Sequence, residues 1–214
     1  MSQSQAVIVL AAGGHAKVLL DALGLCGVTV AGLTDADPVL AGKLIGAAMV
    51  LGQDVVLERY PPERTLLVNG LGSTDSMEAR QALYKRMRER GYRFISVVHP
   101  SAMVARDAVL GEGVQLLAGA IVQTGARIGA NTILNTGAQV DHDCVIGNHV
   151  HIAPGATLSG EVRVGDATHI GTNATVIQGV RIGSQCLVAA GAVLTSDVAD
   201  GERVAGVPAR RIRD

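Results

Sequence analysis

A histidine flanked by two aspartates, in the stretch LNTGAQVDHDCVIG (residues 134–147), is the group of side chains best suited to chemistry in this chain. An imidazole has an unperturbed pKa of about 6.5, so it can accept and return a proton near neutral pH. A carboxylate on the other ring nitrogen fixes the tautomer and stabilises the imidazolium. Asp141, His142 and Asp143 therefore predict a general base with an acidic neighbour, in competition with an incidental polar turn.

A second group of candidate residues lies near the amino terminus. Residues 6–10, AVIVL, have the composition of a buried strand, and in the following AAGGHAK the residues Gly13 and Gly14 end the strand and open a helix. The amide groups at a helix N-terminus suit a phosphate or pyrophosphate. Asp35, about 20 residues further on, ends a second strand and could accept hydrogen bonds from a base or ribose. The alternative is that the two glycines only make a tight turn, and because the spacing is not G-x-G-x-x-G, an NAD site is weakly indicated.

Alternating strand and helix patterns must position these residues. The run VTVAGLTDAD (28–37) predicts a second strand, RTLLVNGLGS (64–73) a third, and YRFISVV (92–98) closes the unit. The segment after AAGGHAK predicts an amphipathic helix, and SMEARQALYKRMRERG (76–91) predicts a charged amphipathic one. The alternation predicts a Rossmann-like α/β unit whose sheet is parallel, with ligand sites at the carboxyl ends of the strands.

The second half of the chain repeats every six residues. Leu, Ile or Val recurs at this interval fifteen times from Leu110 to Leu194, and a small or β-branched residue follows four positions later, from Val114 to Val198. Helices repeat every 3.6 residues and strands every 2, so a sustained period of six fits neither. It is the signature of a parallel β-helix.

A second period shows how the hexads are wound. Glycine follows the aliphatic residue once every 18 residues, at Gly111, Gly129, Gly147, Gly165 and Gly183. Three hexads therefore make one triangular coil, five coils follow, and we expect each glycine to supply backbone freedom at a corner. A narrow interior with room for one aliphatic and one small residue per face explains why no aromatic residue occurs from position 95 onward.

Composition excludes several classes of function. The net charge is −1, which offers no basic field for nucleic acid, and no apolar run approaches the 18 or so residues of a membrane span. The first residues lack a basic n-region, so we expect no secretory signal. Cys26, Cys144 and Cys186 are odd in number, widely spaced and outside any metal pattern, so we expect reduced thiols, a cytoplasmic protein and no bound metal.

The surface of the repeat region is unusually poor in charge. Only nine of the 90 residues from Leu110 to Ala199 are charged, well below the roughly 25% of an average domain. A solvated surface would carry more charged residues. We therefore expect part of it to be buried against other copies of the chain.

Four motifs occur together in order: AAGGHAK near the start, HPSA at 99–102, NTGAQVDHDCVIG at 135–147 and GVPAR at 206–210. This combination resembles, over the whole chain, the bacterial sugar acetyltransferases grouped with sialic acid O-acetyltransferases and UDP-4-amino-sugar N-acetyltransferases. The resemblance implies a left-handed β-helix, a homotrimer, and acetyl-CoA as co-substrate lying along the β-helix between adjacent subunits. It divides the chain into a nucleotide-sugar-binding domain (1–98), the β-helix acetyltransferase domain (99–199) and a tail (200–214).

The resemblance also assigns roles to individual residues. His142 matches the general base and Asp143 its acidic neighbour, which is glutamate in some members of the family. Asn135 matches a polar residue near the base. The positions that match the acetyl-CoA groove are His151, Thr172 and Ala190, and those that match the nucleotide-sugar site are Gly13, Gly14, His15, Asp35 and Gly72.

Spacing gives independent support for the groove. Thr172 and Ala190 are 18 residues apart, so they share a column with Pro154, and a column of small side chains suits a long pantetheine arm. His151 and His169 are also 18 apart and should stack at about 4.8 Å along the axis.

The sequence is compatible with several interpretations. The nucleotide-type unit favours N-acetylation of a nucleotide-linked 4-amino sugar, and O-acetylation of sialic acid or a related sugar is the alternative. A metalloenzyme that uses histidines across a subunit interface and a non-enzymatic sugar-nucleotide sensor are the other classes. Cys144 falls on an inward small position and is interpreted as packing. His149 is interpreted as a solvated turn residue.

Overall fold

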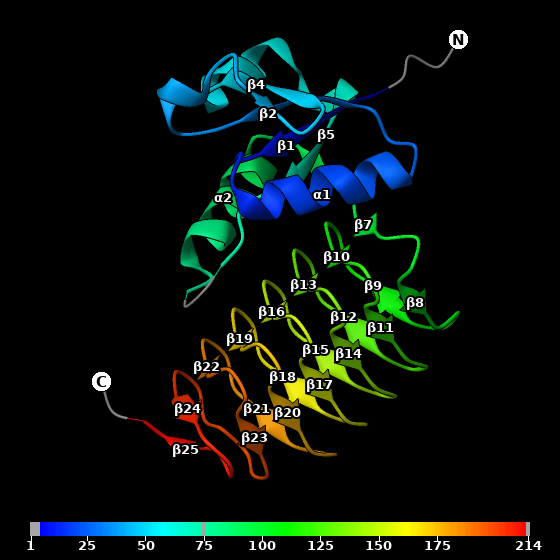
Figure 1. Ribbon diagram of the computed structural model, residues 1–214, viewed down its shortest axis with the longest axis vertical. Helices are drawn as coiled ribbons and strands as arrows, with labels where there is room; N and C mark the ends of the chain where they lie inside the picture. Colours follow the sequence, from blue (N-terminus) through cyan, green and yellow to red (C-terminus); the bar gives the residue numbers. More distant parts are fainter. Residues whose placement is uncertain (1–4, 74–75, 213–214) are drawn as a thin grey trace.

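The computed structural model describes residues 5–73 and 76–212 and consists of an α/β unit packed against a long β-helix (Figure 1). The α/β unit contains one sheet in the order β3-β4-β2-β1-β5-β6. All its neighbouring strands are parallel except β3, which pairs antiparallel with β4. The strands are β1 (Ala6–Leu10), β2 (Val30–Thr34), β3 (Leu44–Ile45), β4 (Ala48–Gly52), β5 (Thr65–Asn69) and β6 (Arg93–Phe94).

Two α-helices connect the strands on opposite faces of this sheet. Helix α1 (Gly14–Leu25) joins β1 to β2, and α2 (Glu78–Glu89) lies between β5 and β6. In β1, Val7 and Val9 belong to the cluster that contains the buried face of α1, whereas Ile8 and Leu10 belong to the cluster of α2. Strand β1 is therefore buried on both faces, as in parallel sheets covered by helices. The 3₁₀ helices are η1 (Pro38–Leu40), η2 (Asp54–Arg59) and η3 (Pro62–Arg64).

This arrangement confirms the predicted α/β unit and fixes where it can bind a ligand. Strand β1 lies between β2 and β5, so the chain leaves β1 in one direction and returns on its other side at β5. In sheets of this kind the ligand lies outside the carboxyl ends of the strands at this switch point. The loops after β1 and β5 therefore form the expected edge. The hairpin of β3 and β4 was not predicted from the sequence.

The β-helix has three faces of very short parallel strands. Face 1 contains β7 (Val97–Val98), β10 (Gln115–Leu116), β13 (Ile133–Leu134), β16 (His151–Ile152), β19 (His169–Ile170), β22 (Leu187–Val188) and β24 (Arg203–Ala205), with β25 (Arg210–Arg211) antiparallel at its end. Face 2 contains β8 (Met103–Val104), β11 (Ile121–Val122), β14 (Gln139–Val140), β17 (Thr157–Leu158), β20 (Thr175–Val176) and β23 (Val193–Leu194). Face 3 contains β9 (Val109–Leu110), β12 (Arg127–Ile128), β15 (Val145–Ile146), β18 (Arg163–Val164) and β21 (Arg181–Ile182).

The register confirms the two predicted periods. Gln115 pairs with Ile133, and Ile133 with His151, so each coil advances by 18 residues. The aliphatic residues of the hexads and the small residues four positions later fill one continuous interior cluster without aromatic side chains. Pairing on face 1 begins at Val97 and continues to β24.

The expectation that the five periodic glycines supply backbone freedom at a corner was wrong. None of Gly111, Gly129, Gly147, Gly165 and Gly183 is in the left-handed region of backbone space. A Cβ atom on Gly111 would instead lie 2.6 Å from the backbone nitrogen of Ala130 in the next coil. These positions need glycine because adjacent coils approach closely there. Left-handed residues occur two positions later, as at Gly113 and Asn131.

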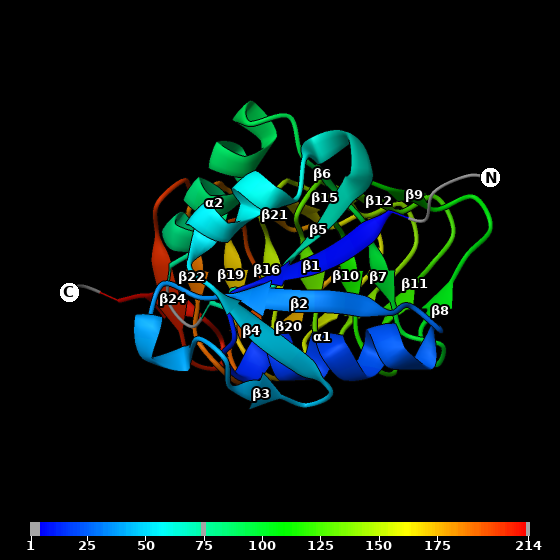
Figure 2. The ribbon, with the colours of Figure 1, turned by 90° about the horizontal axis from the view of Figure 1, so that it is seen from above.

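The α/β unit lies over face 1 of the β-helix, as the view from above shows (Figure 2). Helix α1 packs on Val97 and Leu117 of the first coils. Tyr84 of α2 reaches the corner between faces 3 and 1, where its ring centroid is 5.3 Å from that of His149. His149 is only 7% exposed, so it is a turn residue as predicted but not a solvated one. No helix in the described part of the chain is long and apolar enough to cross a membrane.

Candidate active site

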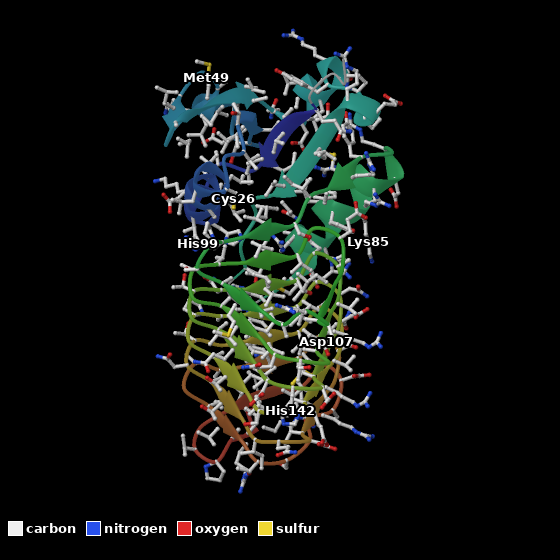
Figure 3. The ribbon with its side chains drawn as sticks, turned by 90° about the vertical axis from the view of Figure 1, so that its right-hand side faces the viewer. Cys26, Met49, Lys85, His99, Asp107 and His142 are labelled. Carbon is white, nitrogen blue, oxygen red and sulfur yellow. The ribbon has the colours of Figure 1, made fainter. Side chains whose placement is uncertain are left out.

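His142 lies at the corner between faces 2 and 3, low on the β-helix in Figure 3 and on the side away from the α/β unit. Its Nδ1 atom is 3.0 Å from Asp143 Oδ2. Because a carboxylate only accepts, Nδ1 carries the hydrogen and Nε2 is left as the proton acceptor. The His142 side chain is 42% exposed, so this acceptor is accessible. The hydrogen bond to Asp143, together with the charges of Asp141, Asp143 and Glu161, raises the pKa of His142 above its ordinary value.

Two glycines in neighbouring coils make room for this pair. The ring of His142 lies against Gly160, where a Cβ atom would be 2.5 Å from His142 Cε1. The carboxylate of Asp143 lies in the same way against Gly125, where a Cβ atom would collide with Oδ1. Sequence reasoning missed both glycines, although each is 18 residues from the side chain it accommodates. The period alone could have found them.

A cavity of about 590 Å³ lies where the loops after β1 and β5 meet face 1 of the β-helix. The β-helix contributes Asn135 and His151 to its wall. All five residues predicted to bind the nucleotide sugar line the same cavity, namely Gly13, Gly14, His15, Asp35 and Gly72.

The two glycines at the start of α1 are not explained by a tight turn. Gly13 is the N-cap, with a φ of −80°, and neither Gly13 nor Gly14 is in the left-handed region. A Cβ atom on either would have no other heavy atom within 4 Å. Neither the backbone nor the packing therefore requires glycine, whereas a side chain at these positions would occupy space in or beside the cavity. The first-turn amides of α1 have no partners within the helix and remain donors for an anion.

Asp35 shapes the same edge of the cavity. Its Oδ2 accepts a hydrogen bond from the backbone nitrogen of Ala12 at 2.8 Å, and its Oδ1 accepts one from that of Asp37 at 2.9 Å. Each carboxylate oxygen can accept a further hydrogen bond, so the side chain can hold the loop after β1 and still contact a ligand.

Replacement of Asp35 should affect one substrate only. We expect Asp35→Ala to raise the KM for the nucleotide sugar by roughly ten- to a hundredfold, because hydrogen bonds to a charged group are lost, and to leave the KM for acetyl-CoA nearly unchanged. Asp37→Ala is the matched control, since its carboxylate accepts from Val39 and does not line the cavity. Steady-state kinetics with each substrate varied in turn measures both constants. Equal effects on the two constants would show that the sites are not divided between the domains.

His151 lies in this cavity rather than on the column of Thr172 and Ala190. Its Nε2 atom is 3.1 Å from the Asn135 side-chain nitrogen, and its Nδ1 atom is 2.9 Å from Ser73 Oγ. Asn135 Oδ1 accepts from the Thr136 backbone nitrogen, so the Asn135 amide donates to Nε2. Burial, with smaller contributions from nearby positive charge, lowers the pKa of His151 to about 3, so the ring is neutral at physiological pH.

Pro154, Thr172 and Ala190 form the predicted column at the corner between faces 1 and 2. The coils are joined there by hydrogen bonds from Asn173 to the Pro154 carbonyl oxygen at 2.9 Å and from Gly191 to that of Thr172 at 2.8 Å. Thr172 and Ala190 are exposed, and no charged residue occurs at this corner between residues 110 and 199. The surface has the small, uncharged side chains that a pantetheine arm would require.

Comparison with known proteins identifies the family. Residues 125–160 match the family "Bacterial transferase hexapeptide (six repeats)", and residues 161–196 match "Hexapeptide repeat of succinyl-transferase". A histidine-to-alanine mutant of GDP-perosamine N-acetyl transferase from Caulobacter crescentus, in complex with CoA and GDP-perosamine, is 38% identical over 98% of this chain and 97% of its own, with a TM-score of 0.92. The acetyltransferase domain of PglB from Neisseria gonorrhoeae, in complex with acetyl coenzyme A, is 33% identical over 98% and 100% of the two chains, with a TM-score of 0.90.

The chain belongs to the hexapeptide-repeat sugar acetyltransferases. Its β-helix is left-handed, as the resemblance implied, and acetyl-CoA is the co-substrate of the family.

In this sugar acetyltransferase, a metal site shared across a subunit interface would draw on His142, His149, His151 and His169 of the β-helix. His142 and His149 lie at different corners, and only His151 and His169 are in ring contact, with centroids 4.9 Å apart. Among residues 5–73 and 76–212, no group of three or more His, Cys, Asp or Glu side chains is placed to hold a metal ion. Cys144 is buried in the interior of the β-helix, in agreement with a packing role.

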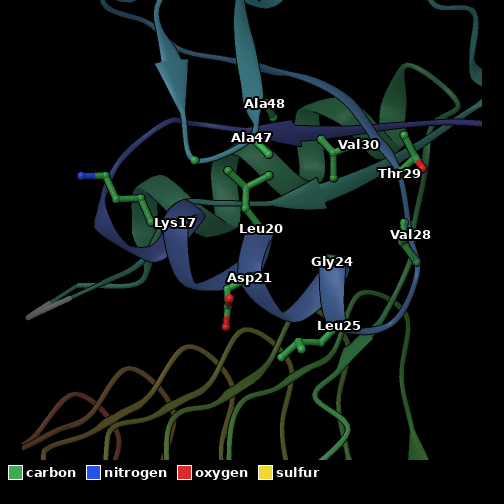
Figure 4. Close-up of a pocket in the computed structure, with 11 residues that line it drawn as sticks. Lys17, Leu20, Asp21, Gly24, Leu25, Val28, Thr29, Val30, Ala47 and Ala48 are labelled. Carbon is green, nitrogen blue, oxygen red and sulfur yellow. The ribbon is translucent and has the colours of Figure 1, made fainter.

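The sugar acetyltransferase has a second cavity of about 620 Å³, between α1 and the turn of the β3–β4 hairpin (Figure 4). Its wall is mainly apolar, with Leu20, Val28 and Val30 among the lining residues, and its only charged residues are Lys17 and Asp21. None of the predicted site residues lines it. Volume alone therefore does not distinguish the two cavities as ligand sites, whereas the converging polar groups at the switch point are found only in the first of the two.

Proposed function

We propose that the protein transfers the acetyl group of acetyl-CoA to the amino group of a 4-amino sugar linked to a nucleoside diphosphate. The observation that carries the proposal is the cavity at the switch point, which joins a helix N-terminus and Asp35 to Asn135 and His151 of the β-helix. A helix N-terminus suits the diphosphate, and Asp35 suits the donors of a base or ribose. The similarity to a protein crystallised with CoA and GDP-perosamine makes GDP-perosamine the first acceptor to test.

His142 and Asp143 supply the acid–base chemistry in this proposal. The amine of the sugar attacks the thioester carbonyl carbon, and His142 Nε2 accepts the proton that the amine loses. The carbon–sulfur bond breaks, and CoA leaves as a thiolate that takes up the proton and returns His142 to its neutral form. Asp143, 3.0 Å from Nδ1, holds the ring with Nε2 free and stabilises the imidazolium. The acyl group is already activated in the thioester, so no cysteine or serine nucleophile is needed. Thr172 and Ala190 line the path of the pantetheine arm, and His151 lies where that path meets the acceptor cavity.

The active form that we propose is a homotrimer with each site shared between neighbouring subunits. Within one chain, Asn135 and His142 lie at opposite edges of face 2, so the cavity and the base do not meet. Face 2 has no charged strand residue, and Met103 at its start is 61% exposed. An uncharged face with exposed apolar side chains suits burial against another copy. Between residues 110 and 199, the charged residues of the β-helix lie on face 3 and at the other two corners.

A shared site gives a sharp expectation for mixed trimers. His142→Ala removes the base, and Gly72→Leu fills the cavity, since a Cβ atom on Gly72 already lies 3.2 Å from His15 Cβ. We expect each variant to be nearly inactive alone and the two, co-expressed, to regain part of the activity, because some sites then combine an intact base with an intact cavity. Light scattering at micromolar concentration should give the mass of a trimer. A monomer, or mixed assemblies with no regained activity, would contradict the shared site.

A panel of acceptors tests the reaction itself. Release of free CoA from acetyl-CoA should be observed with nucleotide-linked 4-amino sugars, beginning with GDP-perosamine and its UDP counterparts. Free sialic acids form the second arm of the panel, and turnover of these alone would favour O-acetylation. Acetyl-CoA binding without turnover of any acceptor would favour a sensor.

We propose the cytoplasm as the compartment, which agrees with the free thiols of Cys26, Cys144 and Cys186.

A further inference from the structure

Arg80 of α2 is fully buried without a carboxylate partner among the described residues. Its guanidinium donates instead to three backbone carbonyl oxygens: Nη1 to those of Asn69, at 2.9 Å, and Leu71, and Nε and Nη2 to that of Asn131, both at 3.3 Å. Burial lowers the pKa of Arg80 to about 9. A buried cation without a counterion destabilises a fold, so its position calls for a functional explanation. These contacts attach the loop after β5, one wall of the acceptor cavity, to a corner of the β-helix.

A chain of hydrogen bonds connects the Asn69 carbonyl oxygen, through Gln115, to His15. Gln115 Nε2 donates to the Asn69 carbonyl oxygen at 2.8 Å, and Gln115 Oε1 is 2.7 Å from His15 Nε2. A carbonyl oxygen can only accept, so the amide of Gln115 must present its NH₂ group to Asn69 and its oxygen to His15. That oxygen also only accepts. His15 Nε2 therefore carries a hydrogen.

The other ring nitrogen of His15 is left as an acceptor. Burial and the positive charge of Arg80 lower the pKa of His15 to about 4, so the ring is neutral near pH 7. The other ionisable groups around the cavity are His151, which is neutral there, and Asp35. Among the described residues, His15 Nδ1 has no hydrogen-bond partner. It is also not fully enclosed by protein atoms. Because His15 lines the cavity, Nδ1 is open to a ligand.

We propose that Arg80 and Gln115 are positioning residues that fix His15 in its neutral Nε2–H form, so that Nδ1 accepts a hydrogen bond from a hydroxyl group of the nucleotide sugar. The proposal deepens the proposed function and rests on it for the identity of the ligand. Nδ1 in this form repels a phosphate oxygen, which also only accepts. The diphosphate is thereby directed to the amides of Gly13, Gly14 and the first turn of α1, and His15 selects a ribose or sugar hydroxyl.

The tautomer can be measured without any enzymatic activity. Nitrogen-15 spectra of protein labelled at histidine, recorded at pH 7, should show His15 with a protonated Nε2 and an unprotonated Nδ1, with His15→Gln used to assign the signals. Gln115→Met should convert this signal to a mixture of tautomers. A protonated Nδ1 in the wild type, in either the other tautomer or the imidazolium, would overturn the proposal. Because the spectra are recorded without any nucleotide sugar, the result does not depend on whether the proposed reaction is correct.

Kinetics with GDP-perosamine, or with whichever nucleotide sugar the panel identifies, tests the hydrogen bond. The side-chain oxygen of asparagine can replace Nδ1, whereas the amide of glutamine replaces Nε2. We expect His15→Asn to raise the KM of the nucleotide sugar less than His15→Gln, which should raise it about tenfold or more because the ligand hydroxyl loses its acceptor. The KM of acetyl-CoA should stay nearly constant. Equal losses in the two variants would contradict the assignment of Nδ1.

Arg80 is tested against a matched arginine of the same helix. Arg80→Met should give a mixture of His15 tautomers and raise the KM of the nucleotide sugar about tenfold. Arg80→Lys should show smaller changes in both the tautomer populations and the KM. Arg88→Met is the control, since Arg88 also links α2 to the β-helix, through Glu112 at 2.9 Å, but does not touch the loop after β5. The same changes in Arg88→Met would overturn the role of Arg80. If Arg80→Met does not fold, Gln115→Met tests the same connection.

Discussion

His142→Ala is expected to lower kcat by roughly 10²–10⁴-fold with little change in either KM, because the lost proton transfer belongs to the transition state. Asp143→Asn should cost less, since the proton acceptor remains. The substitution should also leave the backbone conformation unchanged, because Asp143 has a φ of 58° and asparagine tolerates this left-handed region well. Steady-state rates with GDP-perosamine and acetyl-CoA measure both variants. If His142→Ala keeps most of the wild-type rate, the base lies elsewhere and the DHD sequence is an incidental polar turn.

The pH profile provides a second test of the same residue. His142 must be neutral to accept a proton, so the rate should fall as pH decreases through its pKa, which lies above the ordinary value because of Asp143. Asp143→Asn removes the main cause of that shift, so the acidic limb should move to lower pH. The amine of the acceptor can give a limb on the same side. The limb of His142 should vanish in His142→Ala, whereas an amine limb should remain.

Gly160→Ala should lower kcat by roughly 10–10²-fold, although residue 160 itself does no chemistry. The new methyl group would occupy the place of the His142 ring and displace it, and a shift of about 1 Å at a reacting group can cost a factor of this size. The fold does not require glycine here, because the same corner position in other coils holds Thr124 and Gln178. We expect a stable protein whose KM values are nearly unchanged.

A double-mutant cycle separates a displaced ring from a damaged coil. In the His142→Ala background the ring is absent, so Gly160→Ala should cause no further loss of rate and little loss of thermal stability. A similar drop in melting temperature in both backgrounds would mean that the methyl group clashes with the coil. In that case Gly160 would not be a support for the base.

The sequence predicted the β-helix well because its physical cause is periodic. Interior residues such as Leu116 and Leu134 recur at fixed intervals, and the register follows directly from the step of 18. The role of Gly111 and its equivalents was misjudged, because a sequence pattern does not distinguish a need for positive φ from the close approach of another coil. The β3–β4 hairpin was missed because the strand β3 has only two residues and lacks a pattern of its own.

The candidate site was predicted in part. The five residues predicted to bind the nucleotide sugar do lie together, because strand ends in a parallel sheet meet at one edge. His149 and Arg80 could not be placed from the sequence. His149 falls at a corner that looks solvated until Tyr84 covers it, and Arg80 belongs to a helix rich in exposed arginines. Their burial is decided by how the α/β unit docks on the β-helix, which no local pattern encodes.

The 18-residue coil limits how this enzyme can change in evolution. An insertion or deletion of a whole number of coils leaves every later side chain on its own face. A change of another length within the repeats would turn the remainder of the β-helix about its axis and move Thr172 or Ala190 off the corner between faces 1 and 2. The distance along the axis from His142 to the last coil can therefore change only in steps of about 4.8 Å, the spacing of neighbouring strands. In the arrangement that we propose, with the thioester arm beside the β-helix, the length of arm that fits is set in whole coils. We therefore expect a related enzyme that uses a longer or shorter arm to differ from this one by a multiple of 18 residues after His142.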